Sequence, residues 1–330
     1  MKRGFFLLLI LGVSARGAEP GPRIGEPVPR RGDEIVVCGQ LYHATTKVVL
    51  WTDPGGYDAY RVEPRFAPMD QARARGKAAD GVQARYNLRR AASLTPEQVE
   101  RVRGGGWDLP LLRSVVDQFV IHFDARGTSR RCFEVLHDRR SLSVHFMLDI
   151  DGTIYQTLDL KERAWHATVA NTRSIGIEVA NIGAYPVDAS NPLGDWYRPD
   201  GDGKVRIVLP GGPKPGEPDT TASVLRPMRA EEVVGNVQGQ KLVQYDFTPQ
   251  QYEALTKLVA TLCTVFPKIR CDYPRDASGR LITHKLPAEQ LERYQGILGH
   301  YHVQTNKVDP GPAFQWDRVI GDARRLLPSH

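Results

Sequence analysis

Short runs of alternating apolar and polar residues occur in the middle of the chain and predict β-strands. Two of these runs are "QFVIHFDA" at residues 118–125 and "RSIGIEVANIG" at residues 173–183. A third, "LSVHFMLDIDGTIYQTL" at residues 142–158, has Asp151-Gly152 near its centre. Because Asp-Gly is favoured in two-residue hairpin turns, we interpret this third segment as a β-hairpin.

Apolar residues at helical spacing predict helices before and after these strands. The segments "LTPEQVERV" at residues 94–102 and "FTPQQYEALTKLVATLC" at residues 247–263 each have Thr-Pro at their second and third positions and a glutamine three residues after the threonine. This order is typical of a capping box at the start of a helix. A final segment, "PAFQWDRVIGDARRLL" at residues 312–327, places its apolar residues on one helical stripe.

Two stretches depart from this pattern of helices and strands. Residues 185–245 are dense in Pro, Gly and Asp, and such a long irregular stretch in a compact domain indicates an insertion. Residues 16–92 begin with a Pro-, Gly- and Arg-rich linker, contain two β-rich runs at residues 35–38 and 48–51, and then lose any clear pattern. We interpret residues 16–92 as an N-terminal extension and residues 93–330 as one domain carrying the insertion.

The start of the chain has the order of a secretory signal peptide. Two basic residues precede an apolar run from Phe5 to Val13, and small residues follow. The run is too short to remain as a membrane span, although a buried N-terminal helix is an alternative. We expect residues 1–15 to be a signal peptide cleaved after Ala15. The mature chain is then exported to the periplasm, the extracellular space or the cell wall, without a stable membrane span.

Composition narrows the class of protein and its partners but does not indicate a function. The 330 residues are 41% hydrophobic and 25% charged, which is typical of a globular protein, and the formal net charge is +6. No run of Lys and Arg with interleaved aromatic residues occurs, so we expect no nucleic-acid partner. No CxxC motif is present among the four cysteines. The pair Cys263 and Cys271 is favoured for a disulfide by its closeness in sequence, but the pairing stays open.

Two of the predicted strands carry a titratable side chain that needs a partner. Side chains alternate along a strand, so His122 faces away from its apolar neighbours, and Glu178 shares a face with Gly176 and Ala180. Small neighbours of this kind predict open space over the carboxylate. Since a buried charge is costly unless it is paired or ligating, both side chains are candidates for a site.

The segment "GHYHVQTNKVDPGP" at residues 299–312 concentrates further titratable residues, namely His300, His302, Lys307 and Asp309. Three ligands from separate elements, with one position left open, are the plan of a catalytic zinc site. His122 would supply one nitrogen, either His300 or His302 a second, and Asp309 an oxygen. Glu178 would then act as a base and Lys307 would stabilise an oxyanion. A buried structural polar network is the alternative, since no HExxH motif is present.

These segments resemble, in order, those of the zinc-dependent N-acetylmuramoyl-L-alanine amidases of the amidase-2 type, relatives of the peptidoglycan recognition proteins. The resemblance is carried by "FVIHFDA", "LSVHFMLDIDGTIYQTLDLKERAWHA", "NTRSIGIEVAN" and "GHYHVQTNKVDPGPAFQW". It covers roughly residues 93–327, with interruptions at residues 185–245 and near residues 271–296. It implies an α/β fold in which a mixed central β-sheet is flanked by helices, with zinc in an open groove at one edge of the sheet.

The resemblance also implies a role for each candidate residue. The ligands of one catalytic zinc ion are then His122, His300 and Asp309. Glu178 and Lys307 are catalytic, and Trp165 and His166 line the groove and bind substrate, with packing as the alternative for His166. Five further histidines are expected outside the site: His302 as a neighbour, His145 as a structural residue, and His137, His284 and His330 on the surface.

The implied activity is hydrolysis of the amide between N-acetylmuramic acid and L-alanine in peptidoglycan or muropeptides. The alternative is a protein that binds peptidoglycan without cleaving it. Non-catalytic relatives typically lose a metal ligand, whereas the three implied ligands are all present here, which favours the enzyme. Hydrolysis of another amide, such as one in a cross-bridge peptide, is a third hypothesis.

Overall fold

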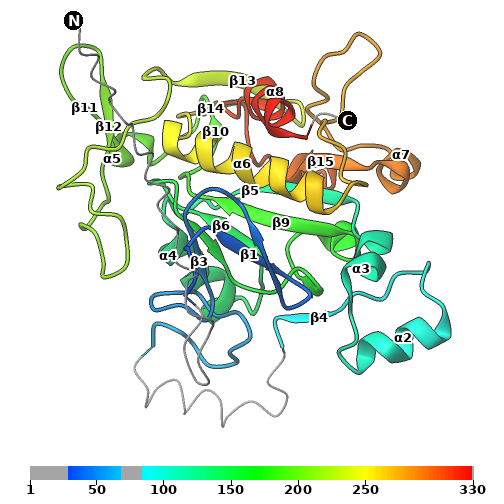
Figure 1. Ribbon diagram of the computed structural model, residues 1–330. Helices are drawn as coiled ribbons and strands as arrows, with labels where there is room; N and C mark the ends of the chain where they lie inside the picture. Colours follow the sequence, from blue (N-terminus) through cyan, green and yellow to red (C-terminus); the bar gives the residue numbers. More distant parts are fainter. Residues whose placement is uncertain (1–28, 68–83, 329–330) are drawn as a thin grey trace, which may run out of the picture. The chain divides into compact units, whose positions relative to one another are not determined.

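The computed structural model describes residues 29–67 and 84–328 (Figure 1). The expected signal peptide, residues 1–15, lies outside these described residues. The described residues from Gly32 onward form one compact unit. Within the described ranges, no helix is both long enough and apolar enough to cross a membrane.

A six-stranded mixed sheet forms the centre of this unit, in the order β15-β5-β9-β6-β7-β3. The strands are β3 Val48–Leu50, β5 Gln118–Phe123, β6 Phe146–Leu148, β7 Ile154–Gln156, β9 Ser174–Val179 and β15 Gly296–Gly299. Strands β15, β5, β9 and β6 are parallel to one another, β6 and β7 form an antiparallel hairpin, and β3 is parallel to β7. The expected mixed sheet and the hairpin about Asp151-Gly152 are confirmed.

The two faces of the sheet have different chemistry because side chains alternate along each strand. On β5, Phe119 and Ile121 point into the main core, which also contains the apolar face of helix α6, Pro249–Val265. This helix runs along the sheet (Figure 1). The opposite face of β5 carries Val120, which belongs to a smaller apolar cluster, and His122. One face therefore stabilises the domain and the other is available for a site.

Helices begin where the capping signals predict. In α2, Pro96–Arg103, and in α6, the threonine side chain before the first turn accepts a hydrogen bond from a backbone N–H, and the glutamine side chain accepts one in return. The last helix, α8 Trp316–Leu326, belongs to the same core as α6. The other helical elements in the described ranges are α3 Leu109–Val115, α4 Ser129–Phe133, η1 Glu134–Arg139, η2 Thr168–Ala170, α5 Leu193–Trp196, α7 Ala288–Arg293 and η3 His300–His302.

The described part of the N-terminal extension does not form a separate region. Strand β1, Glu34–Val37, pairs with β2, Gln40–His43, and β3 extends the central sheet beside β7. Strand β4, Tyr86–Leu88, pairs with β8, Glu162–Ala164. The boundary expected at residue 93 therefore differs from the structure, because these short strands find their partners in distant parts of the chain.

The insertion at residues 185–245 has secondary structure of its own. It contains β10 Tyr185–Pro186, β11 Tyr197–Pro199, β12 Val205–Ile207, β13 Val233–Val237 and β14 Gln240–Gln244, arranged in two small sheets. A small apolar core joins it to Ile150 and Ala180 of the domain. The Glu217 carboxylate, which is fully buried, accepts hydrogen bonds from Arg131 at 2.7 Å and from Thr128 at 2.9 Å.

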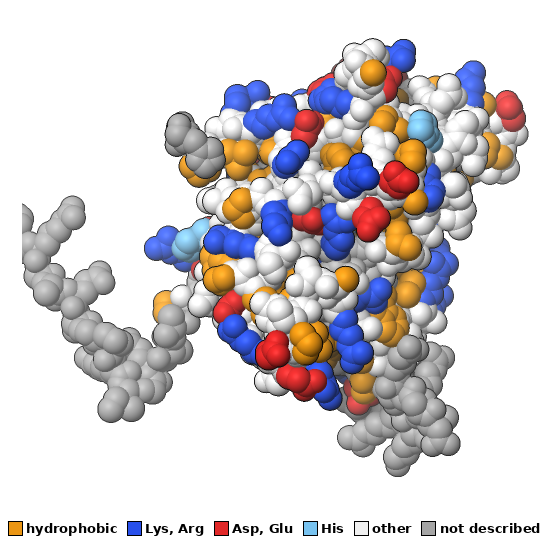
Figure 2. Space-filling model, turned by 90° about the vertical axis from the view of Figure 1, so that its right-hand side faces the viewer, with side chains coloured by type: hydrophobic (Ala, Val, Ile, Leu, Met, Phe, Trp, Pro, Cys, Tyr) orange, Lys and Arg blue, Asp and Glu red, His pale blue; other side chains and the backbone are white. Residues whose placement is uncertain are grey.

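The four cysteines are free thiols, so the structure contains no disulfide among them. Cys263 on α6 and Cys271 after it are close enough to share a hydrogen bond, which lowers the pKa of Cys271. On the face in Figure 2, the described basic, acidic and apolar side chains are interspersed. The net positive charge is therefore not gathered into one band on that face.

Candidate metal and active site

The register of three adjacent parallel strands brings the predicted residues together. His122 lies near the end of β5 and pairs directly with Glu178 on β9. On the other side, Gly299 of β15 pairs with Ile121, so the next residue, His300, emerges beside His122. All three side chains come from the carboxyl ends of the strands, where open α/β sheets place their sites.

Three side chains of this group direct ligand atoms toward one point. His122 Nδ1 lies 2.9 Å from His300 Nδ1 and 2.8 Å from Asp309 Oδ2, and His300 Nδ1 lies 2.9 Å from the same oxygen. The three residues are buried, and they could hold a metal ion. Two imidazole nitrogens and one carboxylate oxygen form a donor set that suits zinc and leaves a fourth position open.

The protonation states of His122 and Asp309 fit metal binding, which needs a neutral imidazole and an ionised carboxylate. Burial, and next the positive charge of His300, lower the pKa of His122 to about 4. Burial raises the pKa of Asp309, but the charge of His300 and hydrogen bonds from both histidines outweigh it and hold that pKa well below its usual range. His122 is therefore neutral and Asp309 ionised near neutral pH.

The far nitrogens of both histidines also have partners. His300 Nε2–H donates to Gln304 Oε1 at 2.7 Å, which leaves the lone pair of Nδ1 directed at the convergence point. His122 Nε2 lies 3.0 Å from His166 Nδ1, and Ser174 Oγ lies 3.2 Å from His166 Nε2. Gln304 was not among the predicted residues, although its position four residues after a ligand in a helical turn is a usable signal.

The Pro-Gly-Pro sequence after Asp309 is held by the insertion. Gln244 of β14 donates to Pro310 O at 3.1 Å and accepts from Ala313 N at 3.0 Å. Gly311 has φ +85°, and a Cβ there would lie 2.1 Å from Gln244 Oε1, so this position requires glycine. Gln244 thus positions the loop that carries Asp309.

A cavity of about 230 Å³ opens over the three candidate ligands. All the predicted site residues line it, namely His122, Trp165, His166, Glu178, His300, Lys307 and Asp309. His302 is not among them. It is fully buried, accepts from Gly299 N at 2.8 Å and donates to Ile282 O at 2.6 Å, so it supports the turn instead.

The carboxylate of Glu178 is partly buried in this cavity. Burial first, and then the negative charges of Asp309 and Asp124, raise its pKa well above the usual value. Asp124, which sequence reasoning missed, also lines the cavity. Its Oδ1 accepts backbone hydrogen bonds from Arg126 and Gly127 at 2.9 Å, while its Oδ2 has no partner among the described residues.

The structure corrects two expectations about neighbouring residues and agrees with a third. The expected open space beside Glu178 is partly filled, since a Cβ on Gly176 would lie 2.5 Å from the ring of His166. His137, expected on the surface, is buried, with Nδ1 at 2.7 Å from Asp138 and Nε2 donating to Arg61 O at 2.9 Å. His145 is fully buried, as expected for a structural histidine.

The insertion at residues 185–245 contributes no described residue to the lining of this cavity. Its contact with the site is indirect, through Gln244 and the loop that carries Asp309. It therefore acts on the position of a candidate ligand and does not form a wall of the cavity.

Comparison with known families gives one match, to part of this domain. Residues 112–215 match the model of the Amidase_2 family, which is described as N-acetylmuramoyl-L-alanine amidase. The matched segment contains His122, Trp165, His166 and Glu178. The other candidate residues, His300, Lys307 and Asp309, lie beyond it and are brought to the site by the fold.

Solved structures with similarity to the chain include three amidases. A selenomethionine derivative of AmpD has 17% identity and a TM-score of 0.31, covering 74% of this chain and 90% of that one. AmiD from E. coli, in complex with anhydro-N-acetylmuramic acid-L-Ala-D-γ-Glu-L-Lys, has 17% identity and a TM-score of 0.36, covering 73% and 62%. LysC from Clostridium intestinale has 16% identity and a TM-score of 0.33, covering 66% and 89%. No curated protein sequence matches the chain.

Proposed function

We propose that this protein is a zinc-dependent amidase that hydrolyses the bond between N-acetylmuramic acid and L-alanine in peptidoglycan or muropeptides. The observation that carries the proposal is the convergence of two imidazole nitrogens and one carboxylate oxygen at 2.8 and 2.9 Å in a cavity that also contains Glu178 and Lys307. The match of residues 112–215 to the amidase family supports the choice of substrate.

The proposed ligands of one zinc ion are His122, His300 and Asp309. When bound, zinc supplies Lewis acidity toward the scissile carbonyl group. The protein contributes the neutral state of His122, the ionised state of Asp309 and the partners that orient both rings. These features prepare His122 and Asp309, and orient the His300 ring, before the ion arrives.

Glu178 is proposed as the general base. Its raised pKa suits a group that must accept a proton from the attacking water and then pass it to the leaving amine of L-alanine. The Lys307 ammonium lines the same cavity and has no ion-pair partner among the described residues. It is therefore free to stabilise the negative charge that develops on the carbonyl oxygen.

Trp165 and His166 are proposed to contact the substrate. The indole N–H of Trp165 is buried without a hydrogen-bond partner among the described residues, so it can donate to a substrate oxygen. His166 lines the cavity and also touches His122 at 3.0 Å, so it links substrate contact to the position of a ligand.

We also propose export, from the signal-peptide pattern of residues 1–15. Expression of the full chain with N-terminal sequencing of the product tests it. A mature protein outside the cytoplasm that begins at residue 16 supports the proposal, whereas an uncleaved chain retained in the cytoplasm contradicts it.

The activity is tested on purified peptidoglycan by counting newly formed L-alanine amino termini. The mature protein is assayed as purified, after treatment with a chelator, and after zinc is restored. Glu178→Gln removes the base while keeping the size of the side chain, and His284→Ala, an exposed histidine, is the matched control.

The proposal predicts cleavage that is lost with the chelator, restored by zinc and abolished in Glu178→Gln, with the control unaffected. Wall binding and bound zinc without cleavage would indicate a peptidoglycan-binding protein. Release of a different amino terminus would indicate hydrolysis of another amide. Absence of stoichiometric zinc would refute the ligand assignment.

A further inference from the structure

A second group of metal-ligating side chains lies away from the candidate site. In the described part of the chain, two groups bring three histidine nitrogens or carboxylate oxygens within 4.8 Å of one another. The first is the set of candidate ligands already described. The second consists of Asp33, Glu34 and His43, here called the hairpin cluster, and the proposed chemistry does not use it.

The hairpin cluster lies at the open end of the hairpin formed by β1 and β2. Glu34 and His43 are directly opposite each other in the register of the two strands, and Asp33 immediately precedes β1. Residues opposite each other in a β-ladder carry their side chains on the same face. His43 Nδ1 lies 2.9 Å from Asp33 Oδ1, so the imidazole is turned toward that carboxylate.

Backbone hydrogen bonds fix the acidic members of the cluster. Glu34 Oε2 accepts from Gly32 N at 2.9 Å and from Asp33 N at 3.2 Å. The carbonyl group of Asp33 accepts from Ala44 N, directly after His43, at 2.7 Å. The three donors are therefore held close together by the fold of the hairpin itself.

The rest of the hairpin is anchored to the domain. Gln156 of β7 accepts from Val36 N at 2.8 Å and donates to Val36 O at 2.9 Å. At the turn, the two carboxylate oxygens of Asp159 accept from Cys38 N at 2.8 Å and from Gly39 N at 2.7 Å. These contacts hold the middle and the turn of the hairpin, and the hairpin cluster lies at the other end. A site on such a rigid element keeps its geometry.

The donors of the hairpin cluster suit a divalent transition metal. One imidazole nitrogen with two carboxylate oxygens is a combination that zinc accepts. Glu34 is buried, whereas the side chains of His43 and Asp33 are 52% and 27% exposed. A metal ion therefore has a path from solvent, and water can complete its coordination. A surface ion pair between His43 and Asp33 is the alternative, and such pairs contribute little to stability.

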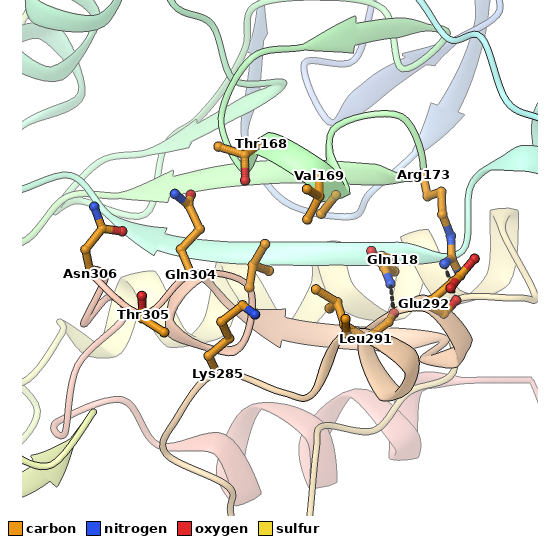
Figure 3. Close-up of a pocket in the computed structure, with 13 residues that line it drawn as sticks. Gln118, Thr168, Val169, Arg173, Lys285, Leu291, Glu292, Gln304, Thr305 and Asn306 are labelled. Carbon is orange, nitrogen blue, oxygen red and sulfur yellow. Dashed lines mark hydrogen bonds between the residues drawn. The ribbon is translucent and has the colours of Figure 1, made fainter.

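A larger cavity elsewhere in the domain offers no comparable set of donors. Its volume is about 610 Å³, and it shares no lining residue with the cavity over the candidate ligands. Among the described residues that line it, Glu292 is the one carboxylate, and none is a histidine or a cysteine. Figure 3 shows Glu292 at one end of this cavity, beside Arg173. Its lining therefore lacks the three donors that the hairpin cluster brings together.

We propose that Asp33, Glu34 and His43 bind a second divalent transition-metal ion, for which zinc is the probe. The ion joins the residue before β1 to the last residue of β2 and closes the open end of the hairpin, as the turn closes the other end. Its role is structural. The proposal goes beyond the amidase function and does not depend on it, since none of the three residues lines the cavity over the candidate ligands.

Zinc content at equilibrium tests the proposal in a two-by-two set of variants. The mature protein, prepared without a histidine tag, is dialysed against chelator-buffered zinc as the wild type and with His43→Ala, His122→Ala or both. We expect two zinc ions per chain in the wild type, one in each single variant and none in the double variant. His284→Ala, which replaces another exposed histidine, is the matched control and should retain both ions.

Conservative variants separate metal binding from a surface ion pair. Asp33→Asn and Glu34→Gln keep the size of the side chain but remove an anionic ligand. Loss of a residue that merely supports a ligand typically weakens metal binding by about 10- to 100-fold, so loss of a ligand should cost at least as much in chelator competition. In the His122→Ala background, zinc should also raise the Tm, because it binds the folded chain, and His43→Ala should abolish that rise.

The variants also distinguish failure of this proposal from failure of the candidate active site. One zinc ion in the wild type that is lost with His122→Ala and retained with His43→Ala overturns the proposal and leaves the candidate active site standing. One zinc ion that is lost only with His43→Ala supports the proposal and refutes the assignment of His122. A second ion that persists in both His43→Ala and Asp33→Asn lies elsewhere, and this result also overturns the proposal.

Discussion

Gly176 offers a sharp test of how the candidate ligands are supported. It lies on β9, two residues before Glu178, and has an extended backbone that other residues can adopt. An alanine Cβ at this position would lie 2.5 Å from Nδ1 and Cε1 of the His166 ring and 2.8 Å from its Cγ. Optimal non-bonded contacts are about 3.5–4.0 Å, so the ring must retreat by about 1 Å.

That retreat has two measurable costs in Gly176→Ala. Forcing a methyl group into a filled space lowers the free energy of unfolding by about 1–3 kcal/mol. The ring can no longer hold His122 Nε2, now 3.0 Å from His166 Nδ1, and loss of such a support typically weakens metal binding by about 10- to 100-fold. Urea unfolding measures the first effect, and competition with a chromogenic chelator for zinc measures the second.

A double mutant tests whether the clash with the His166 ring causes both effects of Gly176→Ala. His166→Ala removes the ring and the clash together, so Gly176→Ala should add almost nothing in that background. Gly194→Ala, where a Cβ meets no atom within 4 Å, is the matched control. The reasoning is refuted if Gly176→Ala binds zinc as tightly as the wild type, or if its effects are as large with His166→Ala as without it.

Three further substitutions test other contacts. Gln304→Ala removes the acceptor of His300 Nε2–H, and we expect zinc affinity to fall about 10-fold in chelator competition; an unchanged affinity would contradict the role of Gln304. Burial raises the pKa of Glu217, but hydrogen bonds, the largest of them from Arg131, outweigh it and hold this pKa below its ordinary value. The ionised carboxylate therefore stabilises the fold at pH values above the pKa that Glu217 has in the unfolded chain, and this stabilisation is lost in acid. Glu217→Gln should therefore lower unfolding free energy by about 1–3 kcal/mol at pH 7 and by much less near pH 3, and equal losses at both pH values would oppose this account. The fully buried guanidinium of Arg89 donates hydrogen bonds to the backbone carbonyl groups of Leu160, Thr172 and Ser174. Arg89→Met leaves these groups without a donor and should lower the free energy of unfolding in urea by about 3 kcal/mol or more. A decrease below about 1 kcal/mol would show that the guanidinium is dispensable.

The sequence predicted those helices and strands whose formation depends on residues close together in the chain. The Thr-Pro capping boxes and the alternation in β5 and β9 depend on residues a few positions apart, and the structure confirms them. His122 was also identifiable as a candidate, because a polar residue inside an apolar strand requires a partner, whereas His300 and Asp309 came from the titratable residues gathered at residues 299–312. The family resemblance then supplied the order of the segments and chose His300 over His302.

Contacts between distant segments could not be predicted in this way. Nothing in the run at residues 48–51 indicates that it pairs with β7, more than a hundred positions further on. The small size of Gly176 suggested empty space, but a side chain from another element fills it. His137 has a polar local sequence, and only tertiary packing buries it beside Asp138 and the backbone of residue 61.

The separation of the two histidines has a consequence for biosynthesis. His122 and His300 lie 178 positions apart and become neighbours only when β15 pairs with β5. A chain emerges from the ribosome N-terminus first, so β5 is exposed long before its partner strand exists. The candidate metal centre cannot assemble until Asp309 has emerged. A nascent or prematurely terminated chain that contains the whole of residues 112–215 therefore lacks the candidate metal centre and, with it, the proposed activity.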